Sequence, residues 1–291
     1  MGRYVAFLAC VWIVTAQAWG QDPERALKPE IPELIAVGRV RTTFAVEFLH
    51  RARYSLSGLE GDLLRLGELD FRVGAGDYAE FQISGVCRDF LTITRRTQQV
   101  LPITFAGDAT SDFGDLILGT KLKLATEQRS RPAVAFRFAV QLPNASNETG
   151  LGTDETDFFS SVLLSKHLGS VEILGNLGLA ILGSPVQANS QADMLTYGFG
   201  ITIPLHNRLE LTGEVYGRQG PVRLGNESLS QVQAGARFRA AGLSWNVAGI
   251  AGLRHFNPSS GLIVGVTYEF QAFAKKRSPV TVRPGKPPGK R

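Results

Sequence analysis

Few of the residues that could do chemistry lie where a reaction would need them. The chain has four histidines, at positions 50, 167, 206 and 255. A hydrolase needs a nucleophile beside a histidine, and only His255, with Ser259 and Ser260 nearby, approaches this arrangement. The other three are expected in a strand or beside turns. The sequence therefore predicts a protein that is not an enzyme and carries no cofactor.

Metal ligands are equally sparse. Asp154, Glu155 and Asp157 form an acidic stretch that could attract Ca²⁺, but a hydrated acidic loop explains it as well, so no metal site is predicted. Cys10 lies in the apolar N-terminal run. If that run is removed, Cys87 is the only cysteine, which leaves neither an intrachain disulfide nor a cysteine-based metal site.

Most charged side chains instead alternate with apolar ones. In residues 155–182, Val171, Ile173 and Leu177 share one face of a strand, while Glu172 and Asn176 share the other. This period of two continues for about eleven residues, whereas a soluble strand usually has ~5–6. A tilted strand that crosses a bilayer needs ~9–11 residues.

Twelve segments repeat this pattern. They cover residues 42–54, 63–73, 78–87, 115–124, 133–142, two strands within 155–182, 192–203, 208–216, 230–239, 243–254 and 262–270. The fold class predicted is all-β, a transmembrane antiparallel β-barrel of about 12 strands, because closure removes exposed strand edges. Short connections after even-numbered strands and longer ones after odd-numbered strands predict that both termini are periplasmic. A secreted β-sandwich is the alternative.

If the apolar faces meet lipid, the opposite faces line a lumen, because Arg or Lys on the lipid face costs ~2–4 kcal/mol at mid-bilayer. The candidate lumen-lining residues are Glu47, Arg51, Glu68, Asp70, Arg72, Glu80, Lys121, Arg137, Glu172, Asn176, Arg208, Glu210, Glu214, Arg237, Arg239 and Arg254, with Arg53, Lys123 and Glu269 as further members. These charges either pair and fill the interior or form a mixed-charge conduit. Twelve strands lie between the filled eight-stranded barrel and the open sixteen-stranded one, so both alternatives stay open.

The termini have other compositions. Residues 1–20 carry Arg3, an apolar run and small residues at 16 and 18, which predicts a cleaved secretory signal. Residues 21–37 are predicted to be an extended periplasmic lead-in, too short for the N-terminal plug of long-chain fatty-acid transporters, followed by the barrel at 38–270. The tail, 271–291, is basic and Pro-rich and is expected in the periplasm. Without its seven basic residues and Arg3, 23 of the 31 basic residues remain against 26 acidic ones, so no nucleic-acid partner is expected.

One segment resembles a known family. The residues are Gly114-Asp115-Leu116-Ile117-Leu118-Gly119-Thr120-Lys121, Ala133-Val134-Ala135-Phe136-Arg137, Gln141-Leu142-Pro143, Gly150-Leu151-Gly152-Thr153-Asp154-Glu155-Thr156-Asp157-Phe158, Leu164-Ser165-Lys166 and Asn176-Leu177-Gly178. They resemble the family of outer-membrane barrels named for the MetA pathway of phenol degradation. The resemblance implies a Gram-negative outer membrane and passage of small, often aromatic, compounds. Pro143-Asn144-Ala145 departs from the family's usual Pro-Thr-Gly.

The last strand is similar to the assembly signal of outer-membrane barrels. Gly265, Tyr268 and Phe270 fit its Gly, aromatic and terminal Phe positions, although Ile263 replaces a polar residue and 21 residues follow Phe270. The partners implied are the lipid bilayer, the barrel-assembly machinery and small-molecule solutes. The function predicted is passive or facilitated passage of small compounds, aromatic or apolar ones included. The alternative is a structural or surface-binding barrel with an occluded lumen and no transport.

Overall fold

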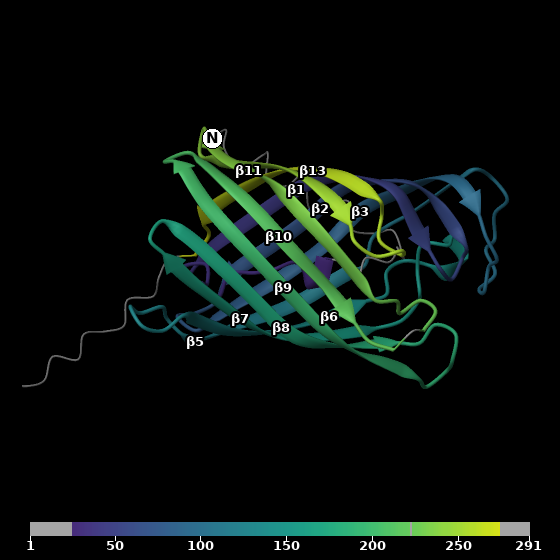
Figure 1. Cartoon of the computed structure of the whole chain (residues 1–291), viewed down its shortest axis with the longest axis horizontal. Coiled ribbons are helices and arrows are strands. Elements are labelled where there is room, and N and C mark those ends of the chain that lie inside the picture. Colours follow the sequence, from purple (N-terminus) through teal and green to yellow (C-terminus); the bar gives the residue numbers. More distant parts are fainter. Residues whose placement is uncertain (1–24, 222, 274–291) are drawn as a thin grey trace, which may run out of the picture.

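The computed structural model describes residues 25–221 and 223–273. The predicted signal, the first residues of the lead-in and nearly all of the tail lie outside this part. In the described residues the chain forms one antiparallel sheet (Figure 1). Its strands are β1 (Arg39–Tyr54), β2 (Leu59–Gly74), β3 (Ala79–Arg96), β4 (Ala109–Asp112), β5 (Leu116–Ala125), β6 (Ala133–Leu142), β7 (Asp157–Leu168), β8 (Val171–Gly183), β9 (Gln191–His206), β10 (Leu209–Gln219), β11 (Leu229–Ala240), β12 (Leu243–Gly252) and β13 (Ser260–Gln271).

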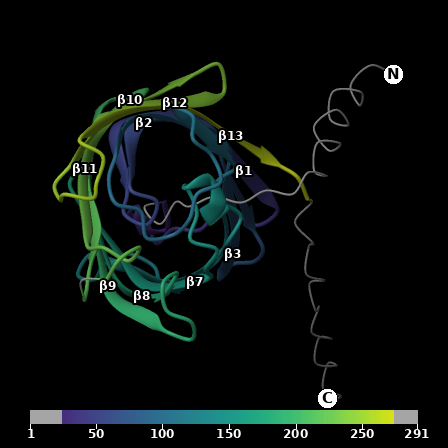
Figure 2. The same ribbon diagram turned by 90° about the vertical axis from the view of Figure 1, so that its right-hand side faces the viewer.

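The sheet closes into a barrel because its first and last long strands pair. β1 runs antiparallel to β13, with Arg39 opposite Gln271 and His50 opposite Ser260. Seen end-on, the strands form a ring (Figure 2). β4 is the exception, since it pairs with β3 alone. Twelve strands therefore make the wall, and the predicted antiparallel barrel is confirmed.

Two short 3-10 helices accompany the strands in the described residues: η1 (Arg25–Leu27) and η2 (Asn147–Thr149). No helix in this part of the chain is long and apolar enough to span a membrane. Ser146 caps η2 by accepting a hydrogen bond from the Glu148 backbone N, and Gly150 ends it in the left-handed region at φ 79°.

The alternation seen in the sequence becomes an apolar outer surface and a packed interior. In β8, Leu177 is 60% exposed on the outside, whereas Ala180 is 0% exposed inside. Phe44 and Phe48 of β1 are likewise exposed, while Ala45 and Leu49 between and beside them are buried. Each strand thus presents every second residue to the interior, as its period of two requires.

The two ends of the barrel differ. β1 begins and β13 ends at one of them, which we call the terminal end; its turns are tight, as at Gly169 (φ 66°) and at Ala241 and Gly242 (φ 53° and 76°). The opposite end, which we call the loop end, carries the longer connections, including the β6–β7 loop with η2. The connection between β1 and β2, residues 55–58, is an exception, because it is short although it follows an odd-numbered strand.

Candidate functional site: the barrel lumen

The segment that precedes β1 lies inside the barrel. Arg25, Ala26 and Leu27 are buried, and Ala26 and Leu27 pack in a cluster with Phe159, Met194 and Tyr216 of three strands. Both views place η1, in purple, within the outline of the barrel (Figures 1 and 2). The segment that the sequence predicts to be an extended periplasmic lead-in therefore lies inside the barrel from Arg25 onward. We call residues 25–37 the lumen segment.

Glu30 anchors this segment to the barrel wall. Its carboxylate lies 2.9 Å from Nη1 of Arg72 and 3.0 Å from Nε of Arg137, with Nζ of Lys121 3.7 Å away. The side-chain amide of Gln82 also donates to it at 2.8 Å. Burial alone would raise the pKa of Glu30, but Arg72, Arg137 and Lys121 together hold it well below its usual range. Glu30 is therefore a charged, fully partnered carboxylate.

Further contacts hold the segment along its length. Nζ of Lys28 lies 3.1 Å from Oε1 of Glu68, and the backbone N of Ile35 donates to Glu80 at 2.8 Å. Arg25 donates to the backbone O of Asp115 at 2.7 Å. With its amide turned to satisfy both groups, Asn176 bonds the backbone N and O of Glu30 at 2.7 and 3.2 Å. The segment spans the interior from the terminal end toward the loop end.

Two glycines of the barrel wall lie against the lumen segment. A Cβ built on Gly198 of β9 would lie 3.1 Å from Cγ of Pro29. At Gly74, at the end of β2, it would lie 2.4 Å from the backbone O of Ala36. Glycine therefore makes room for the ring of Pro29 at position 198 and for the backbone of the lumen segment at position 74.

The interior changes character along the barrel axis. Toward the terminal end it holds the ion pairs around Glu30, with Lys121 1% and Glu80 0% exposed. Toward the loop end it is largely apolar, with Leu49, Leu63, Leu91, Leu151, Ile250 and Ile263 in one cluster. Between the two, Arg65 lies 2.8 Å from Glu47 and 3.6 Å from Asp89.

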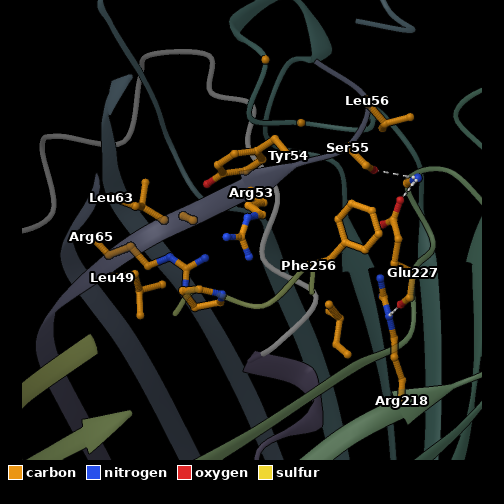
Figure 3. Close-up of a pocket in the computed structure, with 16 residues that line it drawn as sticks. Leu49, Arg53, Tyr54, Ser55, Leu56, Leu63, Arg65, Arg218, Glu227 and Phe256 are labelled. Atoms are coloured by element: carbon orange, nitrogen blue, oxygen red, sulfur yellow. Dashed lines mark hydrogen bonds between the residues drawn. The ribbon is translucent and has the colours of Figure 1, made fainter. Parts of the chain in front are cut away.

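A pocket opens at the loop end beside the apolar cluster, with an empty volume of about 680 Å³ that includes space open to solvent. Its wall combines Leu49, Leu63 and Phe256 with charged side chains (Figure 3). These charges already have partners: Arg53 lies 3.3 Å from Glu60, and Arg218 donates to the backbone O of Glu227 at 2.8 Å. The pocket therefore has a mixed lining, in which apolar side chains lie beside charged groups that already have partners.

The structure sorts the predicted lumen residues into three groups. The first lies in the interior and contacts the lumen segment or the ion pairs around it: Glu47, Glu68, Asp70, Arg72, Glu80, Lys121, Arg137 and Asn176. The second is half-buried on β8 and β10: Glu172 and Glu214. The third lies toward the barrel ends: Arg51, Arg208, Glu210, Arg237, Arg239 and Arg254.

Most members of the third group do not line an enclosed passage. Arg51 is exposed at a bulge, with φ 54°, and Arg254 follows the end of β12 and is exposed. Arg237 and Arg239 are exposed and pair with Glu210 near the terminal end, at 3.3 Å for Arg237. Sequence alternation placed them in the lumen because it indicates the face on which a side chain lies but not its height along the barrel axis.

Several interior charges escaped the sequence analysis, Arg25, Lys28, Glu30, Arg65 and Asp89 among them. Arg25 and Glu30 belong to the segment expected outside the barrel. Arg65 was missed because the alternation of β2 shifts at Gly67, which has φ 70°, so Arg65 and Glu68 both point inward. Asp89 lies in the part of β3 that was not predicted. A glycine inside a strand is the signal that could have revealed the bulge.

The candidates for chemistry are not brought together. Ser259 donates through Oγ to the backbone O of His50 at 3.1 Å, rather than to His255. His50 itself pairs with Asp62 at 2.7 Å and is exposed. In residues 25–221 and 223–273 no group of three His, Cys, Asp or Glu side chains could hold a metal ion.

Asp115, between β4 and β5, is buried and bonds to the start of the β6–β7 loop. Its carboxylate accepts hydrogen bonds from Nε2 of Gln141 at 2.7 Å and from the backbone N of Asn144 and Ala145 at 2.9 and 3.2 Å. Burial raises the pKa of Asp115 to about 8, although these hydrogen bonds oppose the rise. The start of the β6–β7 loop is therefore tied to a titratable side chain.

The predicted assembly signal lies on the strand that closes the barrel. Gly265 sits opposite Ala45 of β1 and Asn246 of β12, and Tyr268 is exposed on the outer surface. A Cβ at Gly265 would lie 2.7 Å from Oδ1 of Asn246. Packing against Asn246 therefore favours glycine at this position, whether or not the assembly machinery recognises it.

Comparison with solved structures finds several similar chains. The COG4313 outer membrane channel from Pseudomonas putida F1 is similar with a TM-score of 0.60 at 15% identity, over 83% of this chain and 99% of that one. The NanC porin has a TM-score of 0.47 at 8% identity, over 77% and 97% of the two chains. The translocator domain of the autotransporter NalP from Neisseria meningitidis has 0.47 at 12%, over 80% and 88%. No curated protein matches the sequence.

The sequence itself carries the family assignment that a shared fold cannot give. The family model for the MetA-pathway of phenol degradation matches residues 61–241, which is more than half of the chain and runs from β2 to the turn after β11. This range contains the lumen cations Arg72, Lys121 and Arg137 as well as the quoted motifs. The chain therefore belongs to the MetA-pathway of phenol degradation family.

Proposed function

We propose that the protein is an outer-membrane channel through which small compounds, aromatic or apolar ones included, pass under the control of its own lumen segment. The observation that carries this proposal is the change of the interior from an apolar loop half to a charged terminal half that residues 25–37 fill. The P. putida channel shares the fold, and its description as a channel supports the proposal.

The loop half suits the entry of such solutes. Its pocket lies beside an apolar cluster and combines apolar side chains with charges that neighbouring groups compensate. Inside the barrel, Ala26 and Leu27 of the lumen segment are buried against side chains of the inner wall. Passage through the barrel therefore requires the lumen segment to move.

We further propose that the terminal end faces the periplasm, that residues 1–20 are a cleaved signal, and that Gly265, Tyr268 and Phe270 act in recognition by the assembly machinery. Short turns at the terminal end and longer loops at the other end are typical of bacterial outer-membrane barrels and support this orientation. We expect no catalytic step in the passage.

The same lumen segment also favours a second candidate, a structural or surface-binding barrel without transport. A segment held by several buried contacts could close the interior permanently. The two candidates differ in their response to removal of the segment, since a gated channel then conducts and a filled barrel does not.

The test uses the purified barrel in planar bilayers and in liposomes. We expect small, infrequent currents from the wild type and at least a tenfold larger conductance from a variant that lacks residues 26–34. Benzyl alcohol should block these currents if aromatic solutes occupy the pocket. If the variant assembles, as shown by its heat-modifiable gel mobility, yet neither conducts nor lets arabinose swell liposomes, the channel proposal fails and the scaffold is favoured.

A further inference from the structure

Three cations converge in the terminal half of the lumen. Arg72 comes from β2, Lys121 from β5 and Arg137 from β6, and Lys121 is 1% exposed. Such a cluster in a closed interior needs negative partners, because an uncompensated buried charge is costly.

The wall supplies only part of that compensation. Asp70 lies 2.7 Å from Nε of Arg72, and Glu80 lies 3.2 Å from Nζ of Lys121 and 4.0 Å from Nη1 of Arg72. Three cations therefore face two wall carboxylates at this site, which leaves it one negative charge short. Gln82, also from the wall, aims its side-chain amide at the same point.

The missing charge comes from the lumen segment. The Glu30 carboxylate receives Arg137 on Oε1 at 3.0 Å, and Arg72 and Gln82 on Oε2 at 2.9 and 2.8 Å. Both oxygens are thus bound by side chains of the wall, in the manner of a bound ligand carboxylate. Glu30 belongs to the lumen segment, whereas every side chain that donates to its carboxylate belongs to the wall. The donors of the site are therefore all present without Glu30.

We propose that Arg72, Lys121, Arg137 and Gln82 form a carboxylate-binding site in the passage, which Glu30 occupies in the resting barrel and which a solute carboxylate takes over by exchange. The ligand class is a small monocarboxylate. This deepens the proposed function by naming a substrate class for the same lumen and rests on it only for the route by which the solute arrives.

The neighbouring charges define how far the segment moves. Lys28, two residues before Glu30, lies 3.1 Å from Glu68 and within the field of Glu214. Expelling the whole segment would expose these acids together with the cations, and the acids would repel an incoming anion. The exchange is therefore local: Glu30 leaves its cations while Lys28 stays with Glu68.

Competition with a tethered group sets the affinity. A carboxylate on the same chain acts at an effective concentration in the mM range, so a free monocarboxylate competes only at comparable concentrations. Removing Glu30 removes this competition. The Glu30→Ala variant is the sharpest probe, because the substitution deletes an acetate-sized group and leaves its partners in place.

The experiment measures the thermal unfolding midpoint of the full-length barrel in detergent, with acetate replacing chloride at fixed ionic strength. We expect Glu30→Ala to lower the midpoint and acetate to restore it, binding about tenfold more tightly than chloride. Glu33→Ala, in the same segment, should show no acetate effect. The double variant Glu30→Ala with Arg137→Gln should lose the rescue. Equal restoration by chloride, or an equal acetate effect on Glu33→Ala, would overturn the site.

A second measurement uses the wild type, so that the site stays testable if Glu30→Ala does not fold. Acetate should increase the fraction of time that the wild-type barrel conducts in planar bilayers, whereas chloride should not. Rescue of Glu30→Ala without any conduction supports the site and contradicts the channel. Conduction by the barrel that lacks residues 26–34, without any acetate effect on either protein, supports the channel and contradicts the site.

Discussion

Nε of Arg137 in β6 lies 3.0 Å from Oε1 of Glu30, so the wall of the barrel and the segment inside it are joined by a buried ion pair. Arg137 also donates through Nη1 to the backbone O of Ala26 at 3.2 Å. One side chain thus holds the lumen segment at two places, four residues apart. Its removal should loosen the segment without altering the strands.

Substituting Arg137→Gln should increase the open fraction of the channel. Breaking a buried ion pair completely costs about 3–5 kcal/mol, but Arg72 and Lys121 still hold Glu30 here. We therefore expect the docked segment to lose about 1–2 kcal/mol, which corresponds to a roughly 5–30-fold larger open fraction in single-channel recordings. Arg129→Gln, at an exposed turn residue, is the matched control and should leave the recordings unchanged.

Substituting Gly198→Leu should displace the lumen segment by crowding it. The new Cβ would lie 3.1 Å from Cγ of Pro29, and extra methyl groups in a packed interior cost about 1–3 kcal/mol. In a Cys87→Ser background, a cysteine placed at Ala26 should then react faster with a water-soluble thiol reagent. Gly175→Leu is the control, because a Cβ at Gly175 meets no atom within 4 Å. Equal labelling rates in both variants would contradict this role of Gly198.

The alternation of side chains was enough to predict the wall but not the contents of the interior. In all twelve wall strands, apolar side chains alternate with polar or small ones, so the strands can be read from the sequence. β6 was predicted with its observed bounds, residues 133–142. β4 was missed because four residues, Ala109–Asp112, are too few to show a period. The interior contacts depend on closure, which brings Glu30 against residues from three different strands.

The lumen segment shows why local patterns have this limit. Its prolines at 29 and 32 and its mixed charges are equally typical of a solvated linker. Contacts inside the barrel, such as the pairing of Lys28 with Glu68 and of Glu30 with its cations, distinguish the two, and these partners are separated by tens of residues along the chain. The bulge at Gly67, in contrast, could have been predicted from the sequence, because a glycine inside a strand often marks a bulge.

The stability of the folded barrel should fall as the pH rises from about 4 to about 8, through the titration of Asp115. Its pKa is raised to about 8 in the folded protein from its ordinary value of 3.8, so the folded state binds the extra proton in this window. The contribution is fully present below the lower value and is lost as the pH rises through the upper one. Asp115→Asn, which mimics the neutral acid, should flatten the dependence of the unfolding midpoint on pH; an unchanged dependence would contradict it.

The outer and inner faces should respond in opposite ways to a new charge. Leu177 is 60% exposed on the outer surface of β8, where an arginine would meet lipid at a cost of ~2–4 kcal/mol near mid-bilayer. Leu177→Arg should therefore reduce the amount of heat-modifiable barrel in the membrane fraction. Gln233→Lys is the control, because Gln233 of β11 lies opposite Glu214 of β10, and a lysine there would gain an ion pair. We expect Gln233→Lys to assemble like the wild type. Equal losses in both variants would contradict the division of the two faces between lipid and lumen. Only that division makes a positive charge costly on the outer face and favourable on the inner face.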